Sequence, residues 1–145
     1  MTISYATNGV GSLVKQNKIW VFDRKNLKTK APEDIKERVL QLADKLVETD
    51  LKPRHIKRPP KNNKYNYIVD IYTKWHGNSL YFCAKYNSSD DMSSFINKFA
   101  RLEYLKTGKF DLAYFRYTGK WWPTEMDIEF KEALKLIKAG GIYEP

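Results

Sequence analysis

The sequence predicts an α+β fold in a single domain: a helix, a four-stranded antiparallel meander and a C-terminal helix, in the order α-β-β-β-β-α. Apolar residues recur at helical spacing near both ends, whereas the middle carries runs that alternate between apolar and polar residues. Short turn sequences separate those runs, and hairpins between consecutive strands make an antiparallel sheet. With 145 residues, the chain is expected to form one domain over 32–139, between a basic N-terminal arm at 1–31 and a C-terminal tail at 140–145.

The first helix is expected to start at Pro32 and to end at Pro53. Proline suits the first helical position, and the acids Glu33 and Asp34 favour the positive end of the helix dipole. The apolar stripe of this helix consists of Ile35, Val39, Leu42, Leu46 and Val47. Within the preceding arm, the apolar run KIWVF at 18–22 fits a short extra strand or a segment laid over the core.

Four strands and a second helix are expected to follow. Alternation and turn residues place the strands at 65–75, 79–86, 95–105 and 110–117. Thr124 is expected to cap the last helix, with Asp127 three residues on in a variant of the capping box. Gly140 and Gly141 mark the end of this helix.

Positive charge is the strongest compositional signal. The formal net charge is +9, which favours a polyanionic partner. The segment KPRHIKRPPKNNK (52–64) has six cations, three prolines and no acid, so it is expected to form an extended, stiff connector. Its expected phosphate contacts are Lys52, Arg54, Lys57, Arg58, Lys61 and Lys64, joined in the arm by Arg24, Lys25, Lys28 and Lys30. A solvated connector that only promotes solubility is the alternative interpretation.

The stretch FRYTGKWWPT (115–124) is the second candidate for a binding surface. Arg116 and Lys120 lie among aromatic residues, a combination that suits single-stranded nucleic acid, and Trp121 and Trp122 are candidates for stacking on bases. Adjacent strand residues point to opposite faces, so the two tryptophans are not expected to share one environment. Ordinary core packing is the alternative interpretation of these rings.

The sequence favours a binding protein over an enzyme. The single cysteine, Cys83, and two unpartnered histidines indicate no metal site, and no nucleotide-binding loop is present, so no cofactor is expected. Asp70, Glu103 and Lys106 are similar in type to the acids and lysine of restriction-type nucleases, but the Glu-x-Lys spacing is absent. No secretory signal or membrane span is apparent, so a soluble cytoplasmic protein is expected.

The predicted order of elements over 32–139 resembles a double-stranded-RNA-binding domain with one extra strand, and equally a cystatin-like sheet wrapped around a helix. The first resemblance implies RNA as the partner. The segment TEMDIEFKEA at the last helix is acidic, however, where a double-stranded-RNA binder carries a basic cluster. The sequence therefore favours a small basic domain that binds nucleic acid or another polyanion. A protein-interaction or assembly module, with self-association open, is the first alternative, and a small hydrolase or nuclease the second.

Overall fold

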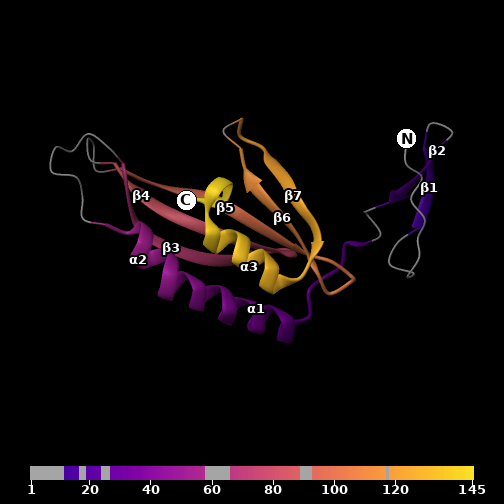
Figure 1. Cartoon of the computed structure of the whole chain (residues 1–145), viewed down its shortest axis with the longest axis horizontal. Helices are drawn as coiled ribbons and strands as arrows, with labels where there is room; N and C mark the ends of the chain where they lie inside the picture. The colour runs from indigo at the N-terminus through magenta and orange to yellow at the C-terminus, as the bar shows by residue number, and fades with distance from the viewer. Residues whose placement is uncertain (1–11, 17–18, 24–26, 58–65, 89–92, 117) are drawn as a thin grey trace.

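In the computed structural model, the described residues are 12–16, 19–23, 27–57, 66–88, 93–116 and 118–145, and side chains are described from residue 27 onward. The predicted α+β class is confirmed, with one strand more than expected (Figure 1). The N-terminal strands β1 (Ser12–Gln16) and β2 (Ile19–Asp23) pair in a separate two-stranded antiparallel sheet, and β2 includes most of the extra strand expected at 18–22.

The main sheet is a five-stranded antiparallel meander in which each strand pairs with the next along the chain. Its strands are β3 (Tyr67–His76), β4 (Ser79–Asn87), β5 (Ser94–Tyr104), β6 (Phe110–Phe115) and β7 (Trp121–Ile128). The four predicted strands correspond to β3–β6. The fifth, β7, lies where the last helix was expected to begin.

The prediction that the first helix ends at Pro53 was wrong. Helix α1 (Glu33–Leu46) continues through a π-helical turn (Val47–Leu51) into α2 (Lys52–His55). Proline lacks the N–H that the helix interior uses, and the wider π turn changes the hydrogen-bond pattern just before it, with Lys52 N–H donating to the Val47 carbonyl. The start of the expected extended connector, 52–55, is therefore helical, and 58–64 lies outside the described residues.

The start predicted for the last helix was also wrong. Helix α3 (Phe130–Ala139) begins after β7, with Glu129 at its N-cap and no side-chain cap. Thr124, the expected cap, instead donates its hydroxyl to the Leu112 carbonyl of β6 at 3.1 Å and shares a hydrogen bond with the Tyr143 hydroxyl. Pairing with β6 outweighs the local capping pattern, because it satisfies a whole row of backbone groups.

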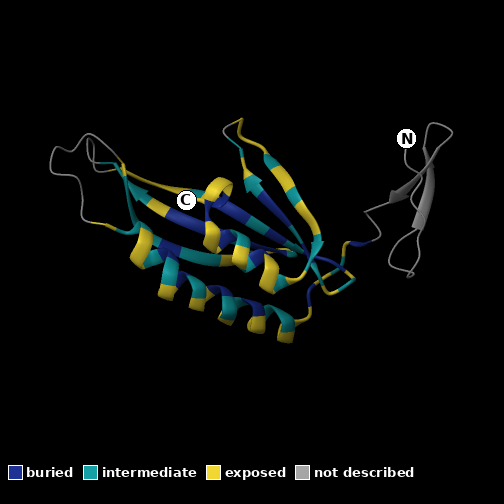
Figure 2. Cartoon of the chain, in the orientation of Figure 1, coloured by how far each residue is buried: buried dark blue, intermediate teal, exposed yellow. Residues whose placement is uncertain are grey.

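The core lies between one face of the sheet and the two long helices. Figure 2 shows the buried positions of α1 and α3 turned toward the sheet. Val39 and Ala43 of α1 and Ala133 and Ile137 of α3 join one cluster with buried residues of every strand from β3 to β6, among them Ile71, Leu80, Phe82, Leu102, Phe110 and Leu112. Both helices therefore cover the same face of the sheet.

Polar contacts fix α1 against the edge strand β3. The Thr73 hydroxyl donates to Asp44 at 2.5 Å, and the Trp75 indole N–H donates to the Lys36 carbonyl at 3.3 Å. At the other end of the chain, the short 3-10 turn Gly141–Tyr143 buries Tyr143 beside the core. Among the described residues, no helix is long and apolar enough to cross a membrane.

Candidate functional site

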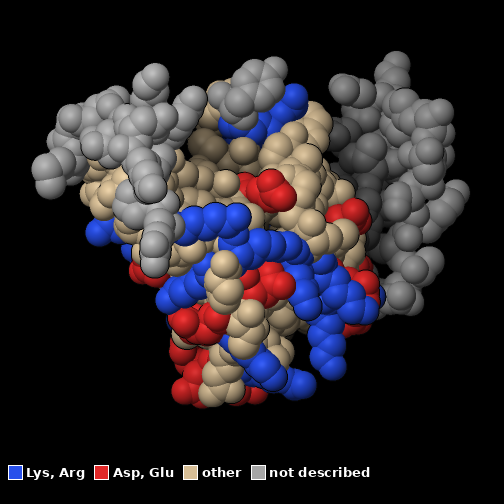
Figure 3. Space-filling view, turned by 60° about the vertical axis from the view of Figure 1, so that its left-hand side comes forward, with Lys and Arg blue, Asp and Glu red and all other residues tan. Residues whose placement is uncertain are grey.

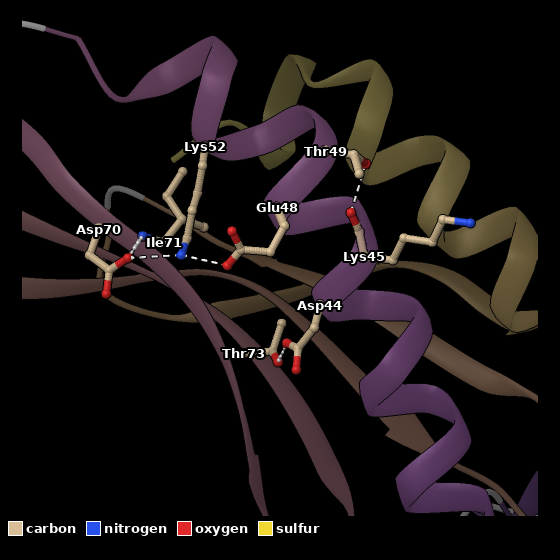
Figure 4. Close-up of polar contacts among 8 residues, drawn as sticks. All are labelled: Asp44, Lys45, Glu48, Thr49, Lys52, Asp70, Ile71 and Thr73. Atoms are coloured by element: carbon tan, nitrogen blue, oxygen red, sulfur yellow. Dashed lines mark hydrogen bonds and ion pairs between the residues drawn. The ribbon is translucent and has the colours of Figure 1, made fainter.

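Lys52 was expected to contact phosphate, but in the structure it is neutralised by two carboxylates (Figure 4). Its Nζ lies 2.6 Å from Glu48 Oε1 and 3.5 Å from Asp70 Oδ1. The hydrogen bond to Glu48 is the largest contribution that raises the pKa of Lys52 above its ordinary value. Lys52 therefore joins α2 to β3 at this position, and it brings little uncompensated charge to a ligand.

Arg54 is held in a similar way. Its guanidinium lies 3.1 Å from Asp50 Oδ1 and donates to the Lys138 carbonyl of α3 at 2.7 Å. Lys57 is exposed and has no ion pair to another described residue. The other predicted contacts of the connector, Arg58, Lys61 and Lys64, and the arm residues Arg24 and Lys25 lie outside the described residues.

Cations and acids alternate over the part of the surface that α1, α2 and α3 form. Figure 3 shows Lys and Arg side chains interspersed with Asp and Glu on this face. In the arm, Lys28 lies 4.0 Å from Glu103 of β5, while Lys30 is exposed. On the face drawn, the basic side chains run in a band across the middle of the molecule, with acidic side chains directly beside it (Figure 3).

The two tryptophans of β7 point to opposite faces of the sheet, as adjacency predicts. Trp122 pairs with Tyr114, which packs against the core, so it lies on the helix-covered side, where it is 52% exposed. The Arg116 guanidinium lies 4.7 Å from the centre of the Trp122 ring. Lys120 is exposed in the turn that joins β6 to β7, where its carbonyl accepts a hydrogen bond from Arg116 N–H at 2.9 Å.

Trp121 lies on the other face, which neither long helix covers. It pairs with Phe115, and the two ring centres are 5.3 Å apart. The ring centre of Tyr81, on β4, lies 5.7 Å from the ring centre of Trp121. The Arg101 guanidinium, on β5, lies 5.0 Å from the Trp121 ring centre. Lys98 of β5 completes the group, with its Nζ 4.8 Å from the Tyr81 ring centre. We call these five residues the open-face cluster.

A shallow hollow of about 300 Å³ adjoins the open-face cluster. Its lining consists of Phe115, Trp121, Ile96, Asn97 and Lys98. The adjacent surface is basic, because Lys74 and Lys85 are exposed on the same face, at positions paired with Tyr81 and Ile96. Aromatic rings, an apolar hollow and several cations thus occur together on this face.

The acids of the open face have partners of their own. Glu103 faces Lys28, and Asp111 accepts a hydrogen bond from the Asp127 backbone N–H at 2.8 Å. Asp70 and Glu103 are the two acids compared above with those of nucleases. In the strand register, Asp70 lies opposite Lys85 of β4 and Glu103 lies opposite Ser79 of β4. Lys85 and Ser79 are six residues apart, so the two acids are separated by about 20 Å along the strand direction. In the described part of the chain, no three His, Cys, Asp or Glu side chains come together as a metal site requires.

Sequence reasoning missed Tyr81, Lys98, Arg101 and Phe115 as members of one surface. Each lies at an outward strand position, but the sequence alone did not give the register that pairs Tyr81 with Arg101 and Phe115 with Trp121. A register shift between Phe82 and Cys83, opposite Phe99, further disturbs the simple alternation on β5. Combining the outward positions of consecutive hairpins would have brought most of the cluster together.

The fold and this surface define a small α+β protein with helices on one face of its sheet and an aromatic, basic surface on the other. Residues 30–142 match the family described as a domain of unknown function (DUF3024), and the chain belongs to that family. Comparisons with curated proteins and with solved structures give no match.

Proposed function

We propose that this protein binds single-stranded nucleic acid across the open face of its sheet. The observation that supports the proposal is the open-face cluster, in which Tyr81, Phe115 and Trp121 lie within ring-contact distance and two cations lie over the rings. Bases stack on aromatic side chains largely irrespective of sequence, and cations beside the rings pair with the phosphates of the same strand.

The geometry favours a single strand over a duplex. The bases of a duplex are stacked on one another, so their faces are not accessible to a ring on a sheet, whereas the bases of a single strand can be splayed out. The hollow beside Trp121 adds an apolar recess in which one unstacked base can lie against Phe115.

The matched pair Trp121→Leu and Trp122→Leu tests this surface. Loss of one stacked base costs about 1–3 kcal/mol, so Trp121→Leu should weaken binding of a ten-nucleotide oligo-dT or oligo-U by roughly 5- to 150-fold in fluorescence anisotropy at low salt. Trp122→Leu should bind like the unchanged protein, because that ring lies on the opposite face. Equal losses for the two variants, or no binding by the unchanged protein, would overturn the proposal. Thermal unfolding of both variants verifies that they remain folded.

Salt titration tests the role of the cations independently. Each phosphate contact on a single strand contributes about 0.7 to the slope of log K against log salt. Lys98→Gln and Arg101→Gln should each reduce that slope by roughly this amount, whereas Lys52→Gln should leave it unchanged, because Lys52 is neutralised by Glu48 and Asp70. A slope that is insensitive to Lys98 and Arg101 but falls with Lys52→Gln would place the binding surface elsewhere.

A protein-interaction or assembly module is the second candidate. Among the residues whose side chains the structure describes, six large apolar ones are between 42% and 53% exposed: Phe95, Ile96, Phe115, Trp122, Met126 and Ile142. Exposed rings of this kind commonly dominate protein interfaces. Sedimentation velocity over a hundredfold range of concentration distinguishes this function, since self-association raises the sedimentation coefficient in the absence of nucleic acid.

A further inference from the structure

A second hollow, on the helical side of the sheet, is larger than the one beside Trp121. It has a volume of about 410 Å³ and lies between α1, the start of α3 and the turn that joins β5 to β6. Its apolar lining consists of Ile35, Val39, Leu42, Phe110 and Phe130. This volume is within the range of about 300–1,000 Å³ that small-molecule sites occupy, and the apolar lining is typical of such sites.

The rim of this hollow carries four charged side chains, Arg38, Glu129, Lys131 and Glu132. Glu132 is neutralised by Lys135 at 3.3 Å. Arg38 makes no ion pair with another described residue. The uncompensated charges are thus two cations and one carboxylate, which leaves the rim positive. The planar guanidinium of Arg38 can bind a carboxylate through two parallel hydrogen bonds.

We propose that the hollow between α1 and α3 binds a small acid with an apolar body and a single carboxylate. The carboxylate pairs with Arg38 at the rim, and the apolar body lies against Ile35, Leu42 and Phe130. This site does not depend on the proposed nucleic-acid surface, because α1 and α3 cover the opposite face of the sheet from Trp121 (Figure 1).

Octanoate and 1-octanol, two probes of equal chain length, test the site on the full chain. In methyl NMR titrations, octanoate should shift the signals of Ile35, Val39 and Leu42, and octanol should bind about tenfold more weakly because it lacks the charge that pairs with Arg38. Arg38→Gln should weaken octanoate binding about tenfold and leave octanol unchanged. Lys45→Gln, an exposed cation on the same helix that does not line the hollow, is the matched control and should have no effect.

Leu42→Trp provides a second variant, because the larger ring should fill the hollow and abolish the methyl shifts of Ile35 and Val39. Circular dichroism verifies that the Leu42→Trp variant is folded. If that variant is unfolded, the Arg38→Gln variant is the test of the site. Equal affinity for octanoate and octanol together with an unaffected Arg38→Gln variant would overturn recognition of a carboxylate. Absence of methyl shifts at millimolar octanoate, or shifts that persist in a folded Leu42→Trp variant, would overturn the site itself.

Discussion

At the scale of single residues, Trp121 and Trp122 show how strand geometry separates neighbours in sequence. Each ring has an arginine beside it, Arg101 at 5.0 Å from Trp121 and Arg116 at 4.7 Å from Trp122. The two pairs lie on opposite faces of the sheet and differ in their surroundings. Among the described residues, Trp121 has further rings in contact and Trp122 has none, so Trp121 is the one that belongs to a surface wide enough for successive bases.

Cys83 illustrates how an outward position can still be buried. It pairs with Tyr72 and Lys98 on the open face, yet it is only 1% exposed, and burial raises the pKa of its thiol. Because the thiolate is the reactive form, we expect iodoacetamide to label Cys83 at pH 7.5 at least about a hundredfold more slowly in the folded protein than in urea. Mass spectrometry of timed samples measures the two rates, and equal rates would contradict the burial of this thiol.

At the scale of elements, β7 is the clearest departure from the sequence prediction. Its Thr124 anchors the strand to β6 through the Leu112 carbonyl and to the C-terminal turn through Tyr143. The backbone of Asp127, near the end of the strand, has a φ of 56°, a conformation that an N3 position of a helix would not have. Two register shifts accompany it along the pairing with β6.

A double-mutant cycle on Thr124 and Tyr143 tests the anchoring role of the threonine. Thr124→Val keeps the branched shape but removes the hydroxyl, so it should lower the free energy of unfolding by about 1–2 kcal/mol. Tyr143→Phe should cost about 1 kcal/mol, and the double variant should cost less than the sum, because both changes remove the same hydrogen bond. Urea unfolding measures all three. Strictly additive losses would show that the two hydroxyls do not interact.

The sequence predicted the elements whose pattern is local and missed features that depend on pairing. Alternation alone located β3–β6, and adjacency alone separated Trp121 from Trp122, since both follow from the period of two in a strand. The capping pattern from Thr124 to Asp127 is equally local, and it predicts a helix start. In the structure this segment instead forms a strand, because its backbone pairs with β6, and that pairing cannot be read from the segment itself. The open-face cluster needs the register of four strands at once, which no single segment encodes.

At the scale of the whole molecule, the end of α2 links stability to pH. His55 is partly buried, and desolvation is the main cause that lowers its pKa, with the charge of Arg54 acting in the same direction. Its Nε2 finds no hydrogen-bond partner among the described residues. The folded state therefore favours the neutral imidazole, whereas the unfolded chain takes up a proton near the ordinary pKa of about 6.5.

The sign of this effect gives an acid-side prediction. The contribution of the neutral His55 to the free energy of unfolding is fully present above about pH 7. This contribution is lost as the pH falls below the pKa of about 6.5 in the unfolded chain toward the lower pKa in the folded protein. The free energy of unfolding should therefore fall less between pH 7.5 and pH 5 in His55→Gln than in the unchanged protein. His76→Gln is the control, since His76 is exposed at the end of β3. Urea unfolding at several pH values measures this, and identical slopes for all three proteins would contradict the assignment.

The two outer strands of the sheet have a consequence for behaviour at high protein concentration. An open sheet edge presents unpaired backbone groups that can recruit a strand from another molecule. Here β7 carries Pro123, which has no N–H to offer, together with its register shifts, and β3 carries a shift between Ile68 and Asp70. Both outer strands of this open five-stranded sheet are therefore poor templates for fibril-like growth.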